Sequence, residues 1–190
     1  MKNHHFNEAT VLLLAATTVL SDDRLRQVQV AHRRHNWLHA PWYPASQGGG
    51  ALTLGNRIYV TGTHDPEAIG EDPMRWLNWV LLMAHEVGHV RQADGFGYSI
   101  VARMRFVLWA SSKYIASFTR NGLAAHAKAP FELEAERGRQ RLRYVLDSTG
   151  GCTPQHPVIR LLVTNDHGTM GTWLAANNAQ IAQAYERVPS

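Results

Sequence analysis

The chain has 190 residues, which is enough for one domain with a sizeable core. Hydrophobic residues make up 45% and charged residues 18%, and these values exclude an intrinsically disordered protein. The net charge of +4 favours anionic surfaces but does not indicate nucleic-acid binding, so we expect no nucleic-acid partner. Because Cys152 is the only cysteine, an intrachain disulfide and a zinc site built from several thiolates are excluded.

Two apolar stretches raise the question of membrane insertion or export. The segment Glu8–Leu20 is too short to span a bilayer, and no small-residue cleavage site follows it. A buried first helix capped by Asn7 fits it better than a signal peptide. The segment Tyr98–Phe118 is long enough to span, but three basic residues interrupt it. We expect no membrane span and synthesis in the cytoplasm, and leave open export without a cleaved signal peptide.

The first sixty residues predict helices followed by a hairpin. Helices are expected at Asn7–Leu20 and Asp22–His35, and the Pro- and Gly-rich segment "HAPWYPASQGGG" is expected to be a loop. Apolar runs at about Ala51–Leu54 and Arg57–Thr61 flank Gly55-Asn56, which is typical of a two-residue hairpin turn.

The rest of the chain predicts helices separated by loops. Asp72 can cap a helix over Pro73–Ala93, because proline suits the first helical position. Loops are expected at "RNGLAAHAKAP", "CTPQHP" and "NDHGTMG". The fold class is α+β, mostly α, with a small antiparallel hairpin or sheet, in a single domain over residues 1–190. The remaining helices are expected at about Tyr98–Thr119, Pro130–Ser148 and Thr172–Glu186.

The segment "LLMAHEVGHVRQ" places His85, Glu86 and His89 in the pattern H-E-x-x-H on a predicted helix. Residues four apart share a helical face, so the two imidazoles point to one place, and zinc accepts such ligands. Glu86 points beside that place, where it can take a proton from water. Gly88 fits a position where another element approaches closely. The motif alone occurs by chance in many unrelated chains, so a third ligand is needed to support a metal site.

A third ligand is available in "APFELEAERG". Glu132 and Glu136 share one helical face, so Glu132 can complete a site of two histidines and one glutamate while Glu136 supports a metal-bound histidine. Alternatively, these acids are solvated and pair with arginines, and the choice of Glu132 over Glu134 stays open. Gln92 shares the face of His85, where it can bond near the site or cap the helix.

The pair "HEVGHVRQ" and "PFELEAE" resembles the gluzincin branch of zinc metallopeptidases, and most closely a group of bacterial zincin-like domains with H-E-x-x-H-V-x-Q and N-P-F-E-x-E-A motifs. The resemblance covers residues 50 to 145 and implies Zn²⁺ as cofactor, with His85, His89 and Glu132 as ligands and Glu86 as general base. Ala129 replaces an asparagine of the family pattern and Glu136 an aspartate. We expect three parts within the single domain: a helical segment 1–50, a zincin-like catalytic core 51–147 and a helical segment 148–190.

The resemblance implies a zinc-dependent hydrolase, foremost a metallopeptidase acting on a peptide or protein that pairs with the edge of the hairpin. Some relatives accompany secreted or injected proteins, so a role as effector or toxin stays open. One alternative is a zincin-fold adaptor module without turnover, bound to a partner protein of a secretion or phage-like system. Another is an anionic-surface binder using the arginines of "RGRQRLR", although a solvated helix face paired with acids is the more usual role of such a run.

A donor besides the metal normally stabilises the oxyanion in such a hydrolase. Sequence does not choose among the candidates, each of which is individually more typical of a packed structural residue. We favour His126 as a catalytic residue, because it lies six residues before Glu132 in a predicted loop. The other candidates are Tyr98, Tyr114, His64 and His167.

Overall fold

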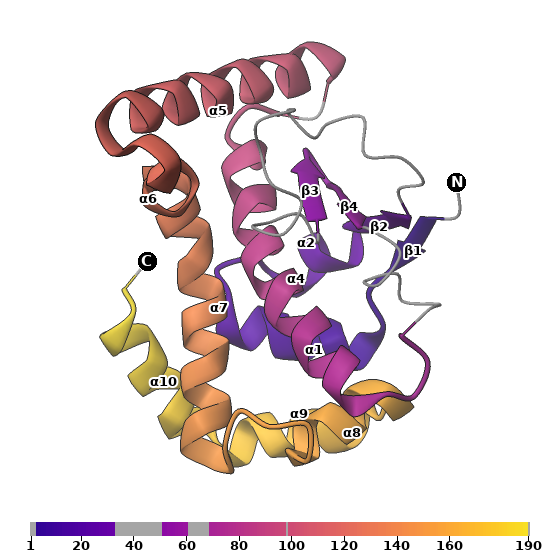
Figure 1. Cartoon of the computed structure of the whole chain (residues 1–190). Helices are drawn as coiled ribbons and strands as arrows, with labels where there is room; N and C mark the ends of the chain where they lie inside the picture. Colours follow the sequence, from indigo (N-terminus) through magenta and orange to yellow (C-terminus); the bar gives the residue numbers. More distant parts are fainter. Residues whose placement is uncertain (1–2, 33–50, 61–68, 98, 190) are drawn as a thin grey trace.

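The computed structural model describes residues 3–32, 51–60, 69–97 and 99–189. A small sheet lies on one side of the molecule, and helices make up the rest (Figure 1). The prediction of an α+β fold, mostly α, is confirmed. The elements in chain order are β1 (Asn3–His5), α1 (Glu8–Thr17), α2 (Asp22–Arg26), β2 (Gln29–His32), β3 (Ala51–Leu54), β4 (Arg57–Val60), α4 (Pro73–Asp94), α5 (Ile100–Asn121), η2 (Gly122–Ala124), α6 (Ala125–Lys128), α7 (Pro130–Thr149), α8 (Pro157–Thr164), α9 (His167–Ala176) and α10 (Asn178–Arg187).

The sheet has the strand order β1-β2-β4-β3. The predicted hairpin is present, since β3 and β4 are antiparallel around Gly55, whose φ of 64° suits glycine. Strands β2 and β4 are parallel, so the sheet is mixed rather than wholly antiparallel. The predicted helix Asp22–His35 is wrong, because α2 ends at Arg26 and β2 follows. Val30 of β2 is buried opposite Ile58, and this pairing outweighs local helix propensity.

Helix α4 runs through the centre of the core. Asp72 caps it by accepting hydrogen bonds from the backbone N–H groups of Met74 and Arg75, and Pro73 occupies the first turn, as predicted. Most of its buried apolar residues belong to one hydrophobic cluster with residues from both the N-terminal and C-terminal parts of the chain. Helices α1 and α8 therefore pack on the helix that carries the H-E-x-x-H motif.

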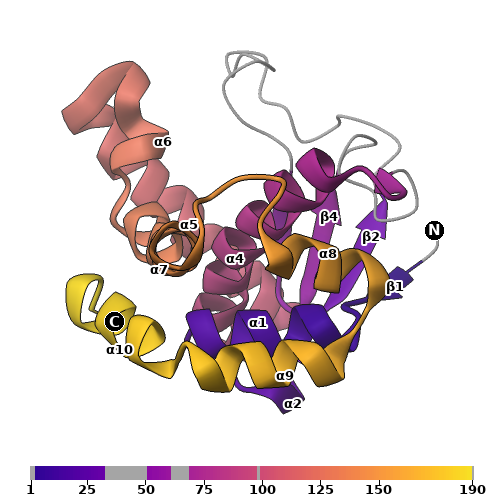
Figure 2. The same ribbon diagram turned by 90° about the horizontal axis from the view of Figure 1, so that it is seen from below.

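The C-terminal region contains more helix than predicted. The segment "RNGLAAHAKAP" is largely helical in η2 and α6, and "NDHGTMG" follows α8 and lies mostly in the first turns of α9. The side chain of Asp166 accepts a hydrogen bond from the N–H of Thr169, so polar residues that resembled a loop are a helix cap. Helix α9 then lies beside α1 (Figure 2). None of the described helices is both long enough and apolar enough to cross a bilayer.

Helices α4 and α7 approach each other at two glycines. A Cβ atom on Gly88 would lie 2.5 Å from the Cα atom of Ala135, and one on Gly138 would lie 2.4 Å from the carbonyl oxygen of Ala84. Glycine is therefore required at both positions, and the close approach expected at Gly88 is confirmed. This contact sets the faces of α4 and α7 that carry the candidate site against each other.

Candidate metal centre

Three side chains converge beside the contact of α4 and α7. The Nε2 atom of His85 lies 3.2 Å from Oε2 of Glu132, and the Nε2 atom of His89 lies 3.5 Å from the same oxygen. Within the described part of the chain, these residues form a group whose potential ligand atoms all lie within 4.8 Å of one another. The structure thus brings together the three residues that the sequence proposed as ligands.

The other nitrogen of each imidazole faces a hydrogen-bond acceptor. Nδ1 of His85 lies 3.1 Å from Oε2 of Glu136, and Nδ1 of His89 lies 3.0 Å from Oε1 of Gln92. The amide group of Gln92 is oriented by its nitrogen, which donates to the carbonyl oxygen of Phe131. Both Nδ1 atoms therefore carry a proton, and whenever a ring is neutral the lone pair of its Nε2 faces Glu132.

This arrangement leaves three acceptor atoms facing one another. Two imidazole nitrogens and a carboxylate oxygen repel unless a proton or a cation lies between them. Glu132 is only 5% exposed, so water does little to screen that repulsion. Zinc is bound by imidazole nitrogen and carboxylate oxygen, and its bound histidines usually donate their other N–H to a carboxylate or a similar acceptor. The donor set and the groups behind it fit such a cation.

Without a cation, protons balance the site. Burial lowers the pKa of His85, but its hydrogen bonds to Glu132 and Glu136, together with the charge of Glu86, outweigh burial and raise this pKa to about 9. Burial likewise lowers the pKa of His89, and the hydrogen bond to Glu132 and the charge of Glu86 raise it overall. At neutral pH His85 is therefore protonated in the metal-free protein, and a divalent cation must displace that proton.

Glu86 points toward the sheet. Its Oε2 atom accepts a hydrogen bond of 2.6 Å from the hydroxyl of Thr53 in β3, and its side chain is buried. Its charge still raises the pKa of both His85 and His89. Sequence reasoning missed Thr53, and the available signal was a polar residue inside the apolar strand "ALTL".

Tyr114 reaches the site from α5. Its hydroxyl donates a hydrogen bond to Oε1 of Glu132, the carboxylate oxygen that does not face the histidines. Its ring packs edge-on against Phe131, with ring centroids 4.6 Å apart, and Phe131 also contacts His89 and Trp109. Tyr114 was one of the candidates for an oxyanion donor, and the structure places it against a proposed ligand.

The acids of α7 separate into different environments. Glu134 is exposed and accepts a hydrogen bond from Gln92, so it lies outside the ligand group. Glu136 bonds His85 on one side and pairs with Arg139 at 2.8 Å on the other. The like charges of Glu132 and Glu136 are therefore relieved separately, the former toward the histidines and the latter by an arginine.

Within the described part of the chain, no contact links the remaining candidate oxyanion donors to this centre. His126 lies in α6 rather than in a loop, but its side chain is outside the described part of the chain. His64 and Tyr98 also fall outside the described residues. His167 is exposed at the start of α9. There it contributes, after the hydrogen bond from Arg26, to lowering the pKa of the Glu8 carboxyl in α1.

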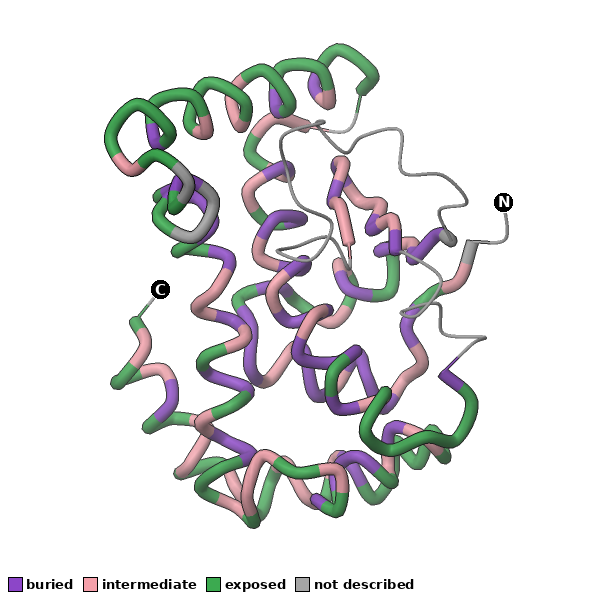
Figure 3. Tube along the Cα trace, viewed as in Figure 1, coloured by how far each residue is buried: buried purple, intermediate pink, exposed green. Residues whose placement is uncertain are grey.

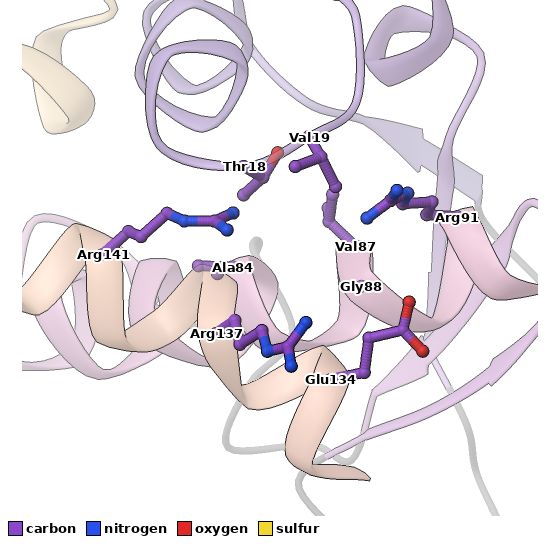
Figure 4. Close-up of a pocket in the computed structure, with 10 residues that line it drawn as sticks. Thr18, Val19, Ala84, Val87, Gly88, Arg91, Glu134, Arg137 and Arg141 are labelled. Atoms are coloured by element: carbon purple, nitrogen blue, oxygen red, sulfur yellow. The ribbon is translucent and has the colours of Figure 1, made fainter. Parts of the chain in front are cut away.

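The arginines of "RGRQRLR" do not form one solvated face. Arg137 and Arg141 line a pocket with Arg91 and Glu134, at a point where α7 faces α4 and the end of α1 (Figure 4). Arg141 is only 1% exposed and stacks on the ring of Tyr185, so the expected solvated face is wrong for this residue. None of the three proposed metal ligands lines this pocket.

Comparisons with known proteins identify no relative of this chain. No protein-family model matches the chain, and no curated protein sequence or solved structure matches it. The case for a function therefore depends on the geometry of the centre and on the two sequence motifs that form it.

Proposed function

We propose that this protein is a zinc-dependent hydrolase, and specifically a metallopeptidase. The observation that carries the proposal is the convergence of Nε2 of His85, Nε2 of His89 and Oε2 of Glu132, each held from behind by a hydrogen bond. Three protein ligands from imidazole and carboxylate are typical of catalytic rather than structural zinc sites. The H-E-x-x-H motif and its gluzincin resemblance support the same assignment.

The residues around the ligands would have different roles in peptide hydrolysis. Zinc held by these ligands would polarise the substrate carbonyl and lower the pKa of water. Glu86 accepts the proton of the attacking water and then delivers it to the leaving amine. Thr53 holds one oxygen of Glu86 in place, which fixes the direction of the other. Tyr114 acts as a positioning residue, because it holds Glu132 rather than a reacting atom.

Strand β3 supports the choice of a peptide as substrate. Among the described residues β3 pairs only with β4, so its other side is an edge of the sheet. The same strand carries Thr53, which contacts Glu86. An extended peptide that adds to this edge would run alongside α4 and bring its carbonyl groups close to the general base.

The first test combines metal content with peptide cleavage by the purified full chain. Glu86→Gln is expected to retain zinc, measured by mass spectrometry, and to lose at least a hundredfold in peptide or casein cleavage. Glu186→Gln, which changes an exposed glutamate of α10, is the matched control and should cleave normally. A protein that binds no zinc, and whose activity is the same with Glu86→Gln, would refute the proposal.

A second pair of variants tests the third ligand. Glu132→Gln is expected to lower zinc affinity by about a hundredfold or more, because it removes the one negatively charged ligand among the three proposed ligands. Glu134→Gln, two residues away and exposed, should bind zinc within about threefold of wild type. Equal losses in both variants would remove Glu132 from the ligand set. Tight zinc binding without cleavage of any peptide would support the adaptor alternative instead.

A further inference from the structure

Helix α5 exposes an apolar stripe, which we define as Ile100, Val101, Met104, Val107, Leu108, Ile115 and Phe118. These side chains are 41% to 77% exposed. Their spacing follows the helical repeat, so they fall on one face and extend almost from one end of α5 to the other. So many exposed apolar side chains on one face of a helix mark a contact with a membrane or a partner.

The opposite face of α5 attaches the helix to the rest of the protein. Phe106 is buried and stacks with Trp109, which contacts Phe131 of α7. Tyr114 lies between this face and the stripe, and its hydroxyl contacts Glu132. Helix α5 lies at the periphery of the molecule, and exposed residues predominate along it (Figures 1 and 3). The stripe therefore turns away from the core while the other face is fixed above the candidate centre.

The charges of α5 have one sign. The helix contains four cationic residues and no Asp or Glu. Arg105 lies next to the stripe on the helical surface, whereas Lys113 and Arg120 are exposed on the opposite side of the helix. Long aliphatic stems allow such side chains to bury carbon atoms while their charges reach the polar region beside an apolar surface. The four cationic residues are Arg103, Arg105, Lys113 and Arg120.

We propose that the apolar stripe of α5 binds the surface of an anionic lipid bilayer, with the helix lying in the plane of the interface. An apolar face combined with basic side chains and no acid is the pattern that inserts between anionic headgroups. A second copy of this chain fits less well, because pairing two stripes would bring the flanking Arg105 side chains of both helices together without an acid on either helix. The charges thus complement a lipid surface and oppose self-association.

This binding would place the candidate centre close to the membrane. Tyr114 connects the inner face of α5 to Glu132, so the centre and the bilayer would be separated by about one helix diameter, roughly 10 Å. The accessible substrates would then include protein segments at a membrane surface. The lipid contact itself does not depend on the proposed hydrolase activity.

Vesicle co-sedimentation of the full chain tests this inference. We expect binding to vesicles of phosphatidylcholine mixed equally with phosphatidylglycerol, and at least tenfold weaker binding to phosphatidylcholine alone or at high salt. Leu108→Gln with Ile115→Gln should weaken binding to the anionic vesicles roughly tenfold or more. The matched control is Met74→Gln with Leu133→Gln, which alters two side chains of α4 and α7 that are 50% and 52% exposed and should bind like wild type.

Two further measurements separate the possible outcomes. Glu86→Gln should bind vesicles like wild type, so failure of the hydrolase proposal and failure of the lipid proposal are distinguishable. No binding to anionic vesicles, or equal binding by the wild type and the Leu108→Gln/Ile115→Gln variant, would overturn the lipid proposal. A dimer seen by analytical ultracentrifugation without lipid, and lost in that variant, would identify a second copy as the occupant and overturn it as well.

Discussion

Helices α4 and α5 follow each other in the chain and have the same length of 22 residues, but they use their side chains in opposite ways. Helix α4 packs against β3, α7 and α8, and its buried residues include His89 and Glu86 of the candidate centre. Helix α5 buries only Ala102, Phe106 and Ser117 and exposes most of its large apolar residues. The difference separates a helix whose buried side chains form part of the candidate centre from one whose apolar side chains are available for contact.

The largest expected difference is between two methionines. Met83 in α4 is completely buried, whereas Met104 in α5 is 61% exposed. Met83→Ala should lower the free energy of unfolding by about 3 kcal/mol, because it removes buried methylene groups and leaves a cavity. Met104→Ala should change it by less than about 0.5 kcal/mol. Urea denaturation followed by circular dichroism measures both, and similar losses would mean that α5 packs as tightly as α4.

A smaller effect is expected where α4 meets α7. Gly88→Ala should cost about 2 kcal/mol of folding stability, because its Cβ would lie 2.5 Å from the Cα of Ala135 and would push the helices apart. The matched control is Gly171→Ala in α9, where a Cβ meets nothing within 4 Å, and alanine should stabilise that helix by up to about 1 kcal/mol. A stable Gly88→Ala protein with normal zinc affinity would show that close contact is not needed to assemble the centre.

The groups behind the ligands should contribute less than the ligands themselves. Glu136→Gln keeps an acceptor for Nδ1 of His85 but removes its charge, so zinc affinity should fall by about tenfold. Competition with a fluorescent chelator measures this affinity, and Glu71→Gln, in an exposed position before α4, serves as the control. An unchanged affinity would mean that the geometry of the acceptor matters and its charge does not.

The smallest effect concerns a buried histidine outside the centre. Burial lowers the pKa of His156, while a hydrogen bond with Thr149 partly opposes burial. The folded protein therefore binds this proton less readily than the unfolded chain, and stability should fall as pH drops below about 6.5, by at most about 1.4 kcal/mol per pH unit. His156→Asn keeps a side chain that can cap α8 and removes the titration. If the free energy of unfolding depends on pH in the same way in this variant and in the wild type, His156 is not the source of the pH dependence.

His85 shows the opposite behaviour for a physical reason that the sequence does not contain. His156 is buried and His85 is partly buried, but His85 faces two carboxylates and His156 faces a hydroxyl and a backbone N–H. The pKa of His85 is therefore raised and that of His156 lowered. Composition and spacing give the number of histidines on a face, but only the neighbours from other elements determine their charge.

The sequence predicted secondary structure correctly where the stabilising contacts are between residues close in the chain. Asn7 and Asp72 cap α1 and α4 as predicted, because a cap bonds only the next few N–H groups. The hairpin at Gly55-Asn56 was also predictable from its turn. The mistaken helix at residues 27–32 and the missed strand β1 have the opposite cause, since β1 and β2 are both stabilised by strand partners that are distant in sequence.

The sequence by itself determined that His85 and His89 share a helical face with Glu86 beside them, because the repeat of an α-helix fixes the direction of residues four apart. Only the tertiary structure decided that Glu132 rather than Glu134 meets them, that Thr53 holds Glu86, and that Tyr114 holds Glu132. Those contacts depend on how close α7, β3 and α5 come to α4. Packing between elements sets these distances, and the pattern within one element does not contain them.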